Sequence, residues 1–214
     1  MADAGKAFAV GWCGGSGVVY GVRLVEVLLR AGHTVHLVAT RAAVRVLVHE
    51  AGACLDPARP DLAGLLPAEL RARLHVHDLD AVEAAPSSGS AGIAATVLVP
   101  CSMGTLARVA HGFSSNLVER MADVALKERR ALVVVPRETP LSAIHLRNML
   151  LLAEAGAVVL PAMPGFYHRP RSVADLVDFV VAKVLVSLGL PQDLVQPWQT
   201  PAGGGSAWNE GEEA

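Results

Sequence analysis

Short runs of aliphatic and β-branched residues alternate along this chain with longer stretches that repeat apolar residues at helical spacing. Runs of this kind, bounded by glycine and polar residues, predict five β-strands. The expected strands are Ala7–Val10, Thr34–Thr40, Thr96–Val99, Leu132–Val135 and Val158–Leu160. Because a helical stretch follows each strand, the pattern predicts an α/β fold in which helices cover both faces of a parallel sheet.

Residues that typically cap helices stand at the ends of the helical stretches. The expected helices are Val18–Ala31, Ala42–Glu50, a stretch after Ser102, Leu141–Ala155 and a last stretch that ends near Leu188. Ser102 stands where an N-cap belongs, and Thr139 with Pro140 is the expected start of the fourth helix. Ser172 followed by Asp175 has the form of a capping box, which predicts the start of the last helix.

Two segments depart from this alternation. Residues 57–92 are rich in Pro, Ala, Ser and Gly and contain one expected helix near Pro67–Leu74, so we interpret them as a connection with a functional loop at 87–90. The tail after Pro201 carries glycines and glutamates but few residues that could build a core. We therefore expect a single domain over residues 1–200 and a disordered C-terminal tail over residues 201–214.

Composition narrows the class of protein. Apolar residues make up 52% of the 214 residues and the mean hydropathy is +0.42, yet no stretch approaches the roughly 18 uninterrupted apolar residues of a membrane span. We find no signal peptide and expect a cytoplasmic protein that buries its apolar surplus between copies in a homo-oligomer. A net charge of −2 without any basic tract argues against nucleic-acid binding.

The cysteines and histidines show no metal-binding pattern. Cys13, Cys54 and Cys101 lack metal-ligand spacing, so we expect three reduced thiols that behave as small buried side chains. The eight histidines also lack such spacing, and Ser16 has no evident base and acid partners of a hydrolase triad. No metal site is therefore expected.

Candidate chemistry gathers where each expected strand ends, the edge at which open parallel sheets bind ligands. The segments at these ends are Gly11–Gly17, Thr40–Arg41, Pro100–Thr105, Pro136–Pro140 and Pro161–Arg169. The first and third place small and hydroxyl residues at helix N-termini, whose free N–H groups favour a phosphate. Two such sites and a nearby arginine suit a mononucleotide such as FMN, although the glycine turn alone is equally explained as a plain strand–helix connection.

Arg137 and Glu138 follow the fourth expected strand and allow two interpretations. In the functional one, Arg137 binds an anion and Glu138 donates or accepts a proton. In the structural one, the two side chains pair with each other or cap the next helix. Arg120, Lys127 and Lys183 are further cationic candidates, but a charged run such as 127–130 predicts by itself only solvated surface.

Three long segments resemble flavin prenyltransferases of the UbiX/Pad type. They are Pro100–Gly112, Ala122–Asn148 and Ala153–Pro170, and the similarity covers nearly the whole chain up to about Trp198. The resemblance implies a flavodoxin-like or Rossmann-like three-layer fold and a homododecamer with active sites at subunit junctions. The chain departs from the family at the Gly14–Gly17 turn, usually Gly-Ala-Ser-Gly, and at Thr40–Arg41, often Ser-Lys.

The resemblance also implies a set of site residues. The implied FMN contacts are Gly14, Gly15, Ser16, Thr40, Ser102, Met103, Gly104, Thr105 and Arg137. The implied ligands of dimethylallyl phosphate, partly from neighbouring copies, are Arg120, Lys127, Tyr167 and Lys183, with Trp198 near the prenyl group. The positions that match catalytic residues are Ser16, Glu50 and Glu138. The implied reaction joins the dimethylallyl group to N5 and C6 of reduced FMN without a metal, and its product serves a UbiD-type decarboxylase.

Two alternatives stay open. An FMN-dependent cysteine decarboxylase of the phosphopantothenoylcysteine type shares the architecture. Such proteins, however, typically have a Pro-Ala-Ser-Ala-Asn-Thr motif where this chain has Pro100–Thr105. A non-catalytic flavin carrier for a decarboxylase is the other, although a carrier would not need the residues that handle phosphate. The pattern does not distinguish dimethylallyl phosphate from the pyrophosphate as the prenyl donor.

Overall fold

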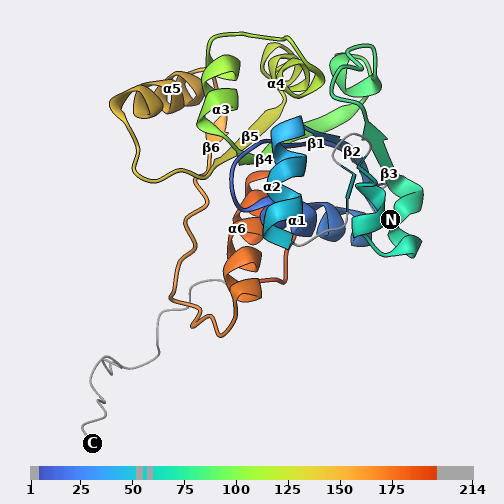
Figure 1. Cartoon of the computed structure of the whole chain (residues 1–214), viewed down its shortest axis with the longest axis vertical. Helices are drawn as coiled ribbons and strands as arrows, with labels where there is room; N and C mark the ends of the chain where they lie inside the picture. The colour runs from blue at the N-terminus through green and yellow to red at the C-terminus, as the bar shows by residue number, and fades with distance from the viewer. Residues whose placement is uncertain (1–4, 52–54, 57–59, 197–214) are drawn as a thin grey trace, which may run out of the picture.

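The computed structural model describes residues 5–51, 55–56 and 60–196, and all structural statements below refer to these residues. One six-stranded parallel sheet with the strand order β3-β2-β1-β4-β5-β6 forms the centre of the fold (Figure 1). Its strands are β1 Ala7–Trp12, β2 Thr34–Ala39, β3 Leu74–His77, β4 Ile93–Cys101, β5 Ala131–Pro136 and β6 Val158–Val159. The expected disordered tail, residues 201–214, lies outside the described residues.

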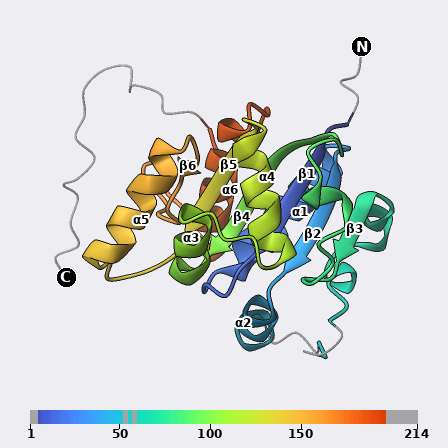
Figure 2. The same ribbon diagram turned by 90° about the horizontal axis from the view of Figure 1, so that it is seen from above.

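Six α-helices connect and cover the strands. They are α1 Val18–Arg30, α2 Arg41–Ala51, α3 Met103–Ala110, α4 Leu117–Lys127, α5 Ala143–Glu154 and α6 Val173–Ser187. Three short 3-10 helices, η1 Ala63–Leu65, η2 Ala68–Arg73 and η3 Ala85–Ser87, lie in the connection between α2 and β4. Viewed from above, α3, α4 and α5 lie together on one side of the sheet (Figure 2). The predicted α/β fold with helices on both faces is confirmed.

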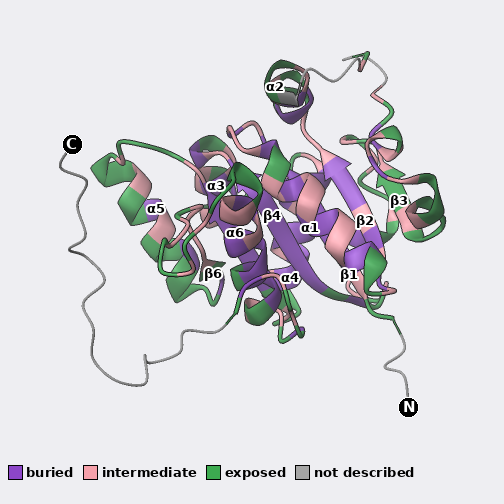
Figure 3. Ribbon diagram, turned by 90° about the horizontal axis from the view of Figure 1, so that it is seen from below, coloured by how far each residue is buried: buried purple, intermediate pink, exposed green. Residues whose placement is uncertain are grey.

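The sheet is buried on both faces, which explains the continuous apolar runs of its central strands. Phe8, Val10 and Trp12 of β1 belong to a core cluster that includes side chains of α1, α2 and α6. Ala9 points to the other face and packs in a second cluster, built mainly with α3 and α4. Figure 3 shows this double burial along β1 and β4, whereas most of α5 is exposed.

The chain reverses its direction of growth at β1, because β2 and β3 lie on one side of it and β4 to β6 on the other. At such a switch point the loops that leave neighbouring strands diverge and leave a crevice at the carboxyl edge. α1 packs tightly above this point. A Cβ added at Gly21 would lie 2.5 Å from both the Trp12 indole nitrogen and the Val99 carbonyl oxygen, so this position needs glycine.

The predicted strands and helices are confirmed within a few residues at their ends, but two elements escaped the sequence analysis. β3 is a short edge strand of four residues, and its two histidines, His75 and His77, leave too few apolar residues to predict a strand. α4 is preceded by Asn116, whose side chain accepts a hydrogen bond from the Glu119 backbone N–H, a start signal that the sequence displays and the analysis missed. The expected helix over Pro67–Leu74 is the 3-10 helix η2.

The expected start of the fourth helix at Thr139 and Pro140 was wrong. The N-cap is Ser142, whose hydroxyl accepts a hydrogen bond from the His145 backbone N–H in a capping box that the His145 side chain completes. Serine followed three residues later by a side chain that reaches back satisfies two N–H groups at once, which explains why the helix begins there. The box that was predicted from Ser172 and Asp175 is confirmed at the start of α6.

Among the described residues, no helix is both long enough and apolar enough to cross a bilayer. The longest helix is α6, with 15 residues, whereas a span needs about 20.

Three histidines gather where β2 pairs with the edge strand β3. Nδ1 of His36 lies 2.9 Å from Nε2 of His77, with the two ring planes within 9° of each other. The ring of His75 lies 5.0 Å from that of His36. Burial, followed by the charges of His77 and His75, lowers the pKa of His36 from 6.5 to about 4. Burial, followed by the charge of His75, also lowers the pKa of His77.

We expect acid to destabilise the fold through this cluster. The folded pKa of His36 lies below its unfolded value, so stability is complete above pH 6.5 and is lost as the pH falls towards about 4. In the wild type this acid-induced loss should lower the free energy of unfolding by on the order of 1 kcal/mol, a small value because solvent screens the half-exposed ring. His36→Gln should abolish this loss. Urea unfolding at several pH values tests this, with exposed His49→Gln as the control; equal pH profiles for both variants would contradict it.

Candidate functional site

The glycine turn, Gly11–Gly17, enters α1 at the carboxyl edge and is tied to the ends of neighbouring strands. The Cys13 N–H donates to the Pro100 carbonyl oxygen over 3.0 Å, which joins the turn to β4. Nε of Arg137 donates to the Ser16 carbonyl oxygen over 3.3 Å, which joins it to the end of β5. The structure thus brings Ser16 and Arg137 together, as the sequence analysis expected of residues at one sheet edge.

The N-terminus of α1 is already occupied by a carboxylate. Gly17, the N-cap, has φ 95° and no side chain to cap with. Oε2 of Glu50, from the last turn of α2, accepts instead from Gly17 N over 2.9 Å and Val18 N over 3.3 Å. The expectation that these N–H groups of α1 are free for a phosphate was therefore wrong, because a glycine cap leaves them to a side chain from elsewhere in the fold.

The N-terminus of α3 keeps its space for an anion. The Ser102 hydroxyl accepts from Thr105 N over 3.3 Å and donates to the Thr105 hydroxyl over 3.1 Å, which confirms Ser102 as the N-cap. A Cβ added at Gly104 would meet no heavy atom within 4 Å. This helix start is the better candidate phosphate site, because no heavy atom crowds its first turn at Gly104.

A cavity of about 260 Å³ lies against Arg137 and Glu138, with Thr139, Leu141, Met149, Pro161 and Met163 among its lining residues. Arg137 turns to Ser16, while Oε1 of Glu138 accepts from the Thr139 backbone N–H over 3.1 Å. The structural alternative in which these two side chains pair with each other receives no support from these contacts. An arginine and a carboxylate that share a cavity without pairing can act on a ligand separately.

Thr40 and the cysteines complete the surroundings of the turn. The Thr40 hydroxyl accepts from Ala43 N over 3.1 Å and so caps α2. Cys13 and Cys101 are buried free thiols, as expected. Their mutual hydrogen bond and burial raise the pKa of the Cys101 thiol well above its usual value, so it stays protonated and unreactive. Cys54 lies outside the described residues.

Tyr167 and Lys183 share a second cavity, of about 230 Å³, on the outer side of α6. Phe179, Val186, Gln192 and Gln196 also line it. This cavity and the one beside Arg137 share no lining residue, so each set of predicted site residues lines a cavity of its own. Trp198, predicted near the prenyl group, lies outside the described residues, two positions beyond Gln196.

Arg120 and Lys127 lie on α4, where they pair with local carboxylates. Nη1 of Arg120 is 3.1 Å from Oδ2 of Asp123, and Lys127 pairs with Glu128. Lys127 ends α4 shortly before β5 begins, which places it at the amino edge of the sheet, opposite the glycine turn. One copy of the chain therefore does not bring Lys127 to the carboxyl-edge site that contains Arg137.

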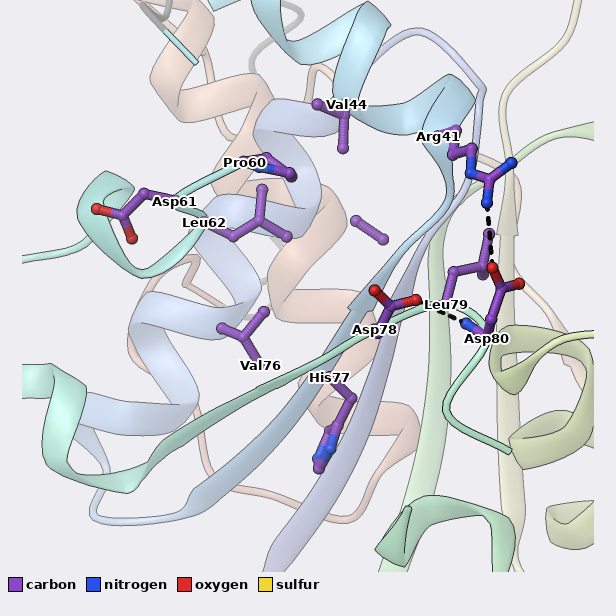
Figure 4. A pocket seen from close by; sticks show the side chains of 11 residues that line it. Arg41, Val44, Pro60, Asp61, Leu62, Val76, His77, Asp78, Leu79 and Asp80 are labelled. Atoms are coloured by element: carbon purple, nitrogen blue, oxygen red, sulfur yellow. Dashed lines mark hydrogen bonds and ion pairs between the residues drawn. The ribbon is translucent and has the colours of Figure 1, made fainter. Parts of the chain in front are cut away.

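A third cavity, of about 520 Å³, lies between α2 and the ends of β2 and β3 (Figure 4). The sequence analysis did not predict it. Its charged side chains already have local partners: Arg41 pairs with Asp80 over 3.1 Å, and Asp61 accepts from Gly64 N over 2.9 Å. The Asp80 N–H donates to Asp78 over 2.9 Å. Among the described residues, no group of three or more metal-binding side chains is arranged to hold an ion.

Comparison with known proteins defines the class first. The family model described as Flavoprotein matches residues 2–185 of the chain, so the chain belongs to the flavoproteins. Within that class it belongs to the flavin prenyltransferase UbiX family. It is 51% identical over 194 residues to "Flavin prenyltransferase UbiX" of Alkalihalophilus pseudofirmus, covering 90% of this chain and 96% of the relative. The protein of that name from Pseudomonas aeruginosa is 49% identical, with 86% and 90% covered.

Solved structures agree with this assignment. A crystal structure of AnUbiX in complex with FMN and dimethylallyl pyrophosphate matches with a TM-score of 0.80 and 38% identity, covering 92% of this chain and 98% of that one. A dodecameric FMN-dependent UbiX-like decarboxylase from Escherichia coli O157:H7 matches equally well, at 0.80 and 38%, with 91% and 100% covered. An FMN-dependent cysteine decarboxylase, TvaF, is 18% identical with a TM-score of 0.57, which shows only the shared fold.

Removing the Glu50 carboxylate should weaken the start of α1. Glu50→Ala leaves the Gly17 and Val18 N–H groups without their acceptor, and we expect the free energy of unfolding to fall by about 1 kcal/mol. Glu50→Gln, which keeps an acceptor oxygen, should lose less. Urea unfolding followed by circular dichroism measures both, beside the exposed Glu154→Ala. A loss in Glu50→Ala no greater than in that control would contradict the capping role.

Proposed function

We propose that this protein is a flavin prenyltransferase that joins a dimethylallyl group to N5 and C6 of reduced FMN. The observation that supports this most directly is the carboxyl-edge arrangement of Ser16, Arg137 and Glu138 beside the open N-terminus of α3. Its relatives carry the same name, and AnUbiX was solved with FMN and dimethylallyl pyrophosphate. The cysteine decarboxylase alternative is not favoured, because its similarity is limited to the fold.

In this proposal the α3 terminus and Arg137 bind FMN. The uncrowded first turn of α3 accepts the phosphate on its backbone N–H groups, with the Ser102 and Thr105 hydroxyls beside it. Gly14, Gly15 and Thr40 border the same edge, where small side chains let a ligand approach the backbone. FMN, once bound, supplies the nucleophilic ring positions, and the chain orients it and excludes water from it.

Tyr167 and Lys183 are the proposed ligands of the prenyl donor's phosphate. Lys183 supplies a positive charge and Tyr167 a hydroxyl in one cavity that is also lined by the apolar Phe179, Val186 and Val195 and by two glutamines. A cation stabilises the negative charge that develops as phosphate departs. Apolar walls shield the electron-deficient allyl group from water. Glu138, whose cavity opens at the same sheet edge as Ser16, is the proposed proton donor and acceptor.

Replacing Glu138 by Gln should abolish most turnover and leave FMN binding intact. We expect a loss of about 100-fold or more in kcat, because an amide cannot transfer protons. Anaerobic incubation with reduced FMN and dimethylallyl phosphate, read by mass spectrometry of the released flavin, should show one added C5 unit for the wild type. A non-catalytic carrier would give unmodified flavin with both proteins and with the pyrophosphate, which would refute the proposal.

The proposal includes assembly into a homo-oligomer, a dodecamer as in the related Escherichia coli structure. Exposed apolar side chains on α5 support it, because such side chains are suited to burial between copies: Ile144, Leu146 and Leu150 are 65%, 52% and 58% exposed. Assembly would also bring Arg120 and Lys127 of one copy to the site of another. We place the reaction in the cytoplasm, where free thiols persist, and propose a UbiD-type decarboxylase as the recipient of the product.

Subunit complementation tests the shared site. Arg137→Ala and Lys127→Ala should each be inactive, because each removes one half of every site. Reassembling an equal mixture should restore about one quarter of wild-type activity if the two residues come from different copies. A mixture of Arg137→Ala with Glu138→Gln, which lie on the same copy, is the matched control and should stay inactive. Equal recovery in both mixtures, or none in either, would contradict a junction site.

A further inference from the structure

The ring of Phe179 lines the cavity that Tyr167 and Lys183 share. Phe179 is buried, with 7% of its surface exposed. The Tyr167 ring meets it edge-on at 5.6 Å, and the ammonium of Lys183 lies 5.5 Å from its centroid. His168 lies parallel to it, 5.2 Å away with 16° between the planes. One ring of α6 therefore contacts both proposed phosphate ligands and the imidazole of His168.

The imidazole of His168 has no hydrogen-bond partner. Both ring nitrogens are hidden from solvent, and neither has a partner among the described residues. A neutral imidazole carries one N–H donor and one acceptor, and leaving them buried and unpaired costs stability. Such groups are rare in folded proteins and call for a physical explanation.

The residue after His168 is also held unfavourably. Arg169 has φ 54°, in the left-handed region that side chains other than glycine seldom adopt. Its N–H donates to the Phe166 carbonyl oxygen over 2.9 Å, which closes a turn around Tyr167 and His168. An unpaired imidazole and a left-handed residue thus follow each other in one turn. Backbone strain of this kind is concentrated at ligand-binding segments.

Packing alone does not account for a histidine here. A phenylalanine would stack on Phe179 equally well and would leave no unpaired nitrogen. The nearby groups favour an anion as the missing partner: Lys183 contributes a positive charge, and Tyr167 a hydroxyl from the same turn. The acidic neighbour of His168 is Asp175, whose pKa is lowered by the hydrogen bond from the Arg171 N–H and, to a lesser extent, by the charge of His168. Its carboxylate accepts hydrogen bonds from the Arg171 and Ser172 backbone N–H groups rather than from the imidazole. A phosphate oxygen is a strong acceptor for a ring N–H.

We propose that His168 is a further substrate-binding residue, whose ring N–H donates a hydrogen bond to a phosphate oxygen of the prenyl donor when the Phe166–Arg169 turn shifts. The proposal rests on the function proposed above, in which Tyr167 and Lys183 hold the same phosphate. Binding would satisfy the imidazole and release the turn from its left-handed residue. The stack on Phe179 keeps His168 next to the cavity.

His168→Phe separates the two roles of the ring, because it keeps the stack and removes the nitrogens. We expect the melting temperature of the FMN-loaded protein to rise by about 2–4 °C, since two unpaired buried atoms are lost. The Kd for dimethylallyl phosphate, measured by calorimetry, should rise by about 10-fold or more. Exposed His75→Phe is the matched control and should leave the Kd unchanged. A higher melting temperature with an unchanged Kd would overturn the proposal.

Two further comparisons keep the test decisive. If the Phe variant does not fold, His168→Gln and His168→Met differ mainly in that Gln keeps an N–H donor. Weaker binding in the Met variant alone supports the proposal, and equal Kd values overturn it. Lys183→Ala should weaken binding whether or not His168 contributes. Unchanged binding in Lys183→Ala would instead refute the proposed substrate site, and the role of His168 would fall with it.

Discussion

The pairing of β1 with both β2 and β4 is the constraint on which the candidate site depends. Strand β1 starts at Ala7 and runs to the carboxyl edge of the sheet, where the Cys13 N–H donates a hydrogen bond to the Pro100 carbonyl oxygen. The helices that follow β1 and β4 both start at this edge, because both strands end there. Gly21 lets α1 lie close to the sheet, so the turn, Ser102 and Arg137 lie at the same carboxyl edge.

Two helices, α1 and α3, start at this same edge, and their backbone N–H groups have different surroundings. A helix N-terminus attracts an anion wherever its N–H groups are free. Glu50 satisfies α1 from within the protein, whereas Gly104 leaves the start of α3 uncrowded. The two helix starts resemble each other in the sequence, yet a carboxylate from another helix occupies only the first of them. The carboxylate that caps α1 also holds the end of α2 against the glycine turn.

The residues that we propose for prenyl transfer do not all meet within one copy of the described chain. Tyr167 and Lys183 share one cavity, Arg137 and Glu138 another, and Lys127 lies at the opposite edge of the sheet. The exposed apolar side chains of α5 supply a surface suited to association. In our proposal catalysis depends on assembly, since burying this surface between copies would also complete the site.

The sequence alone determined the alternating elements, the parallel sheet and the residues at its carboxyl edge, because hydrophobic period and strand-end chemistry are local properties. It also displayed the signals for α4 and for the Ser142 cap. Only the tertiary structure decided that Glu50 fills the N-terminus of α1, that Arg137 turns to Ser16, and that His168 lies unpaired on Phe179. These contacts join residues that are distant in sequence or depend on how a turn packs, and local pattern carries no information about such packing.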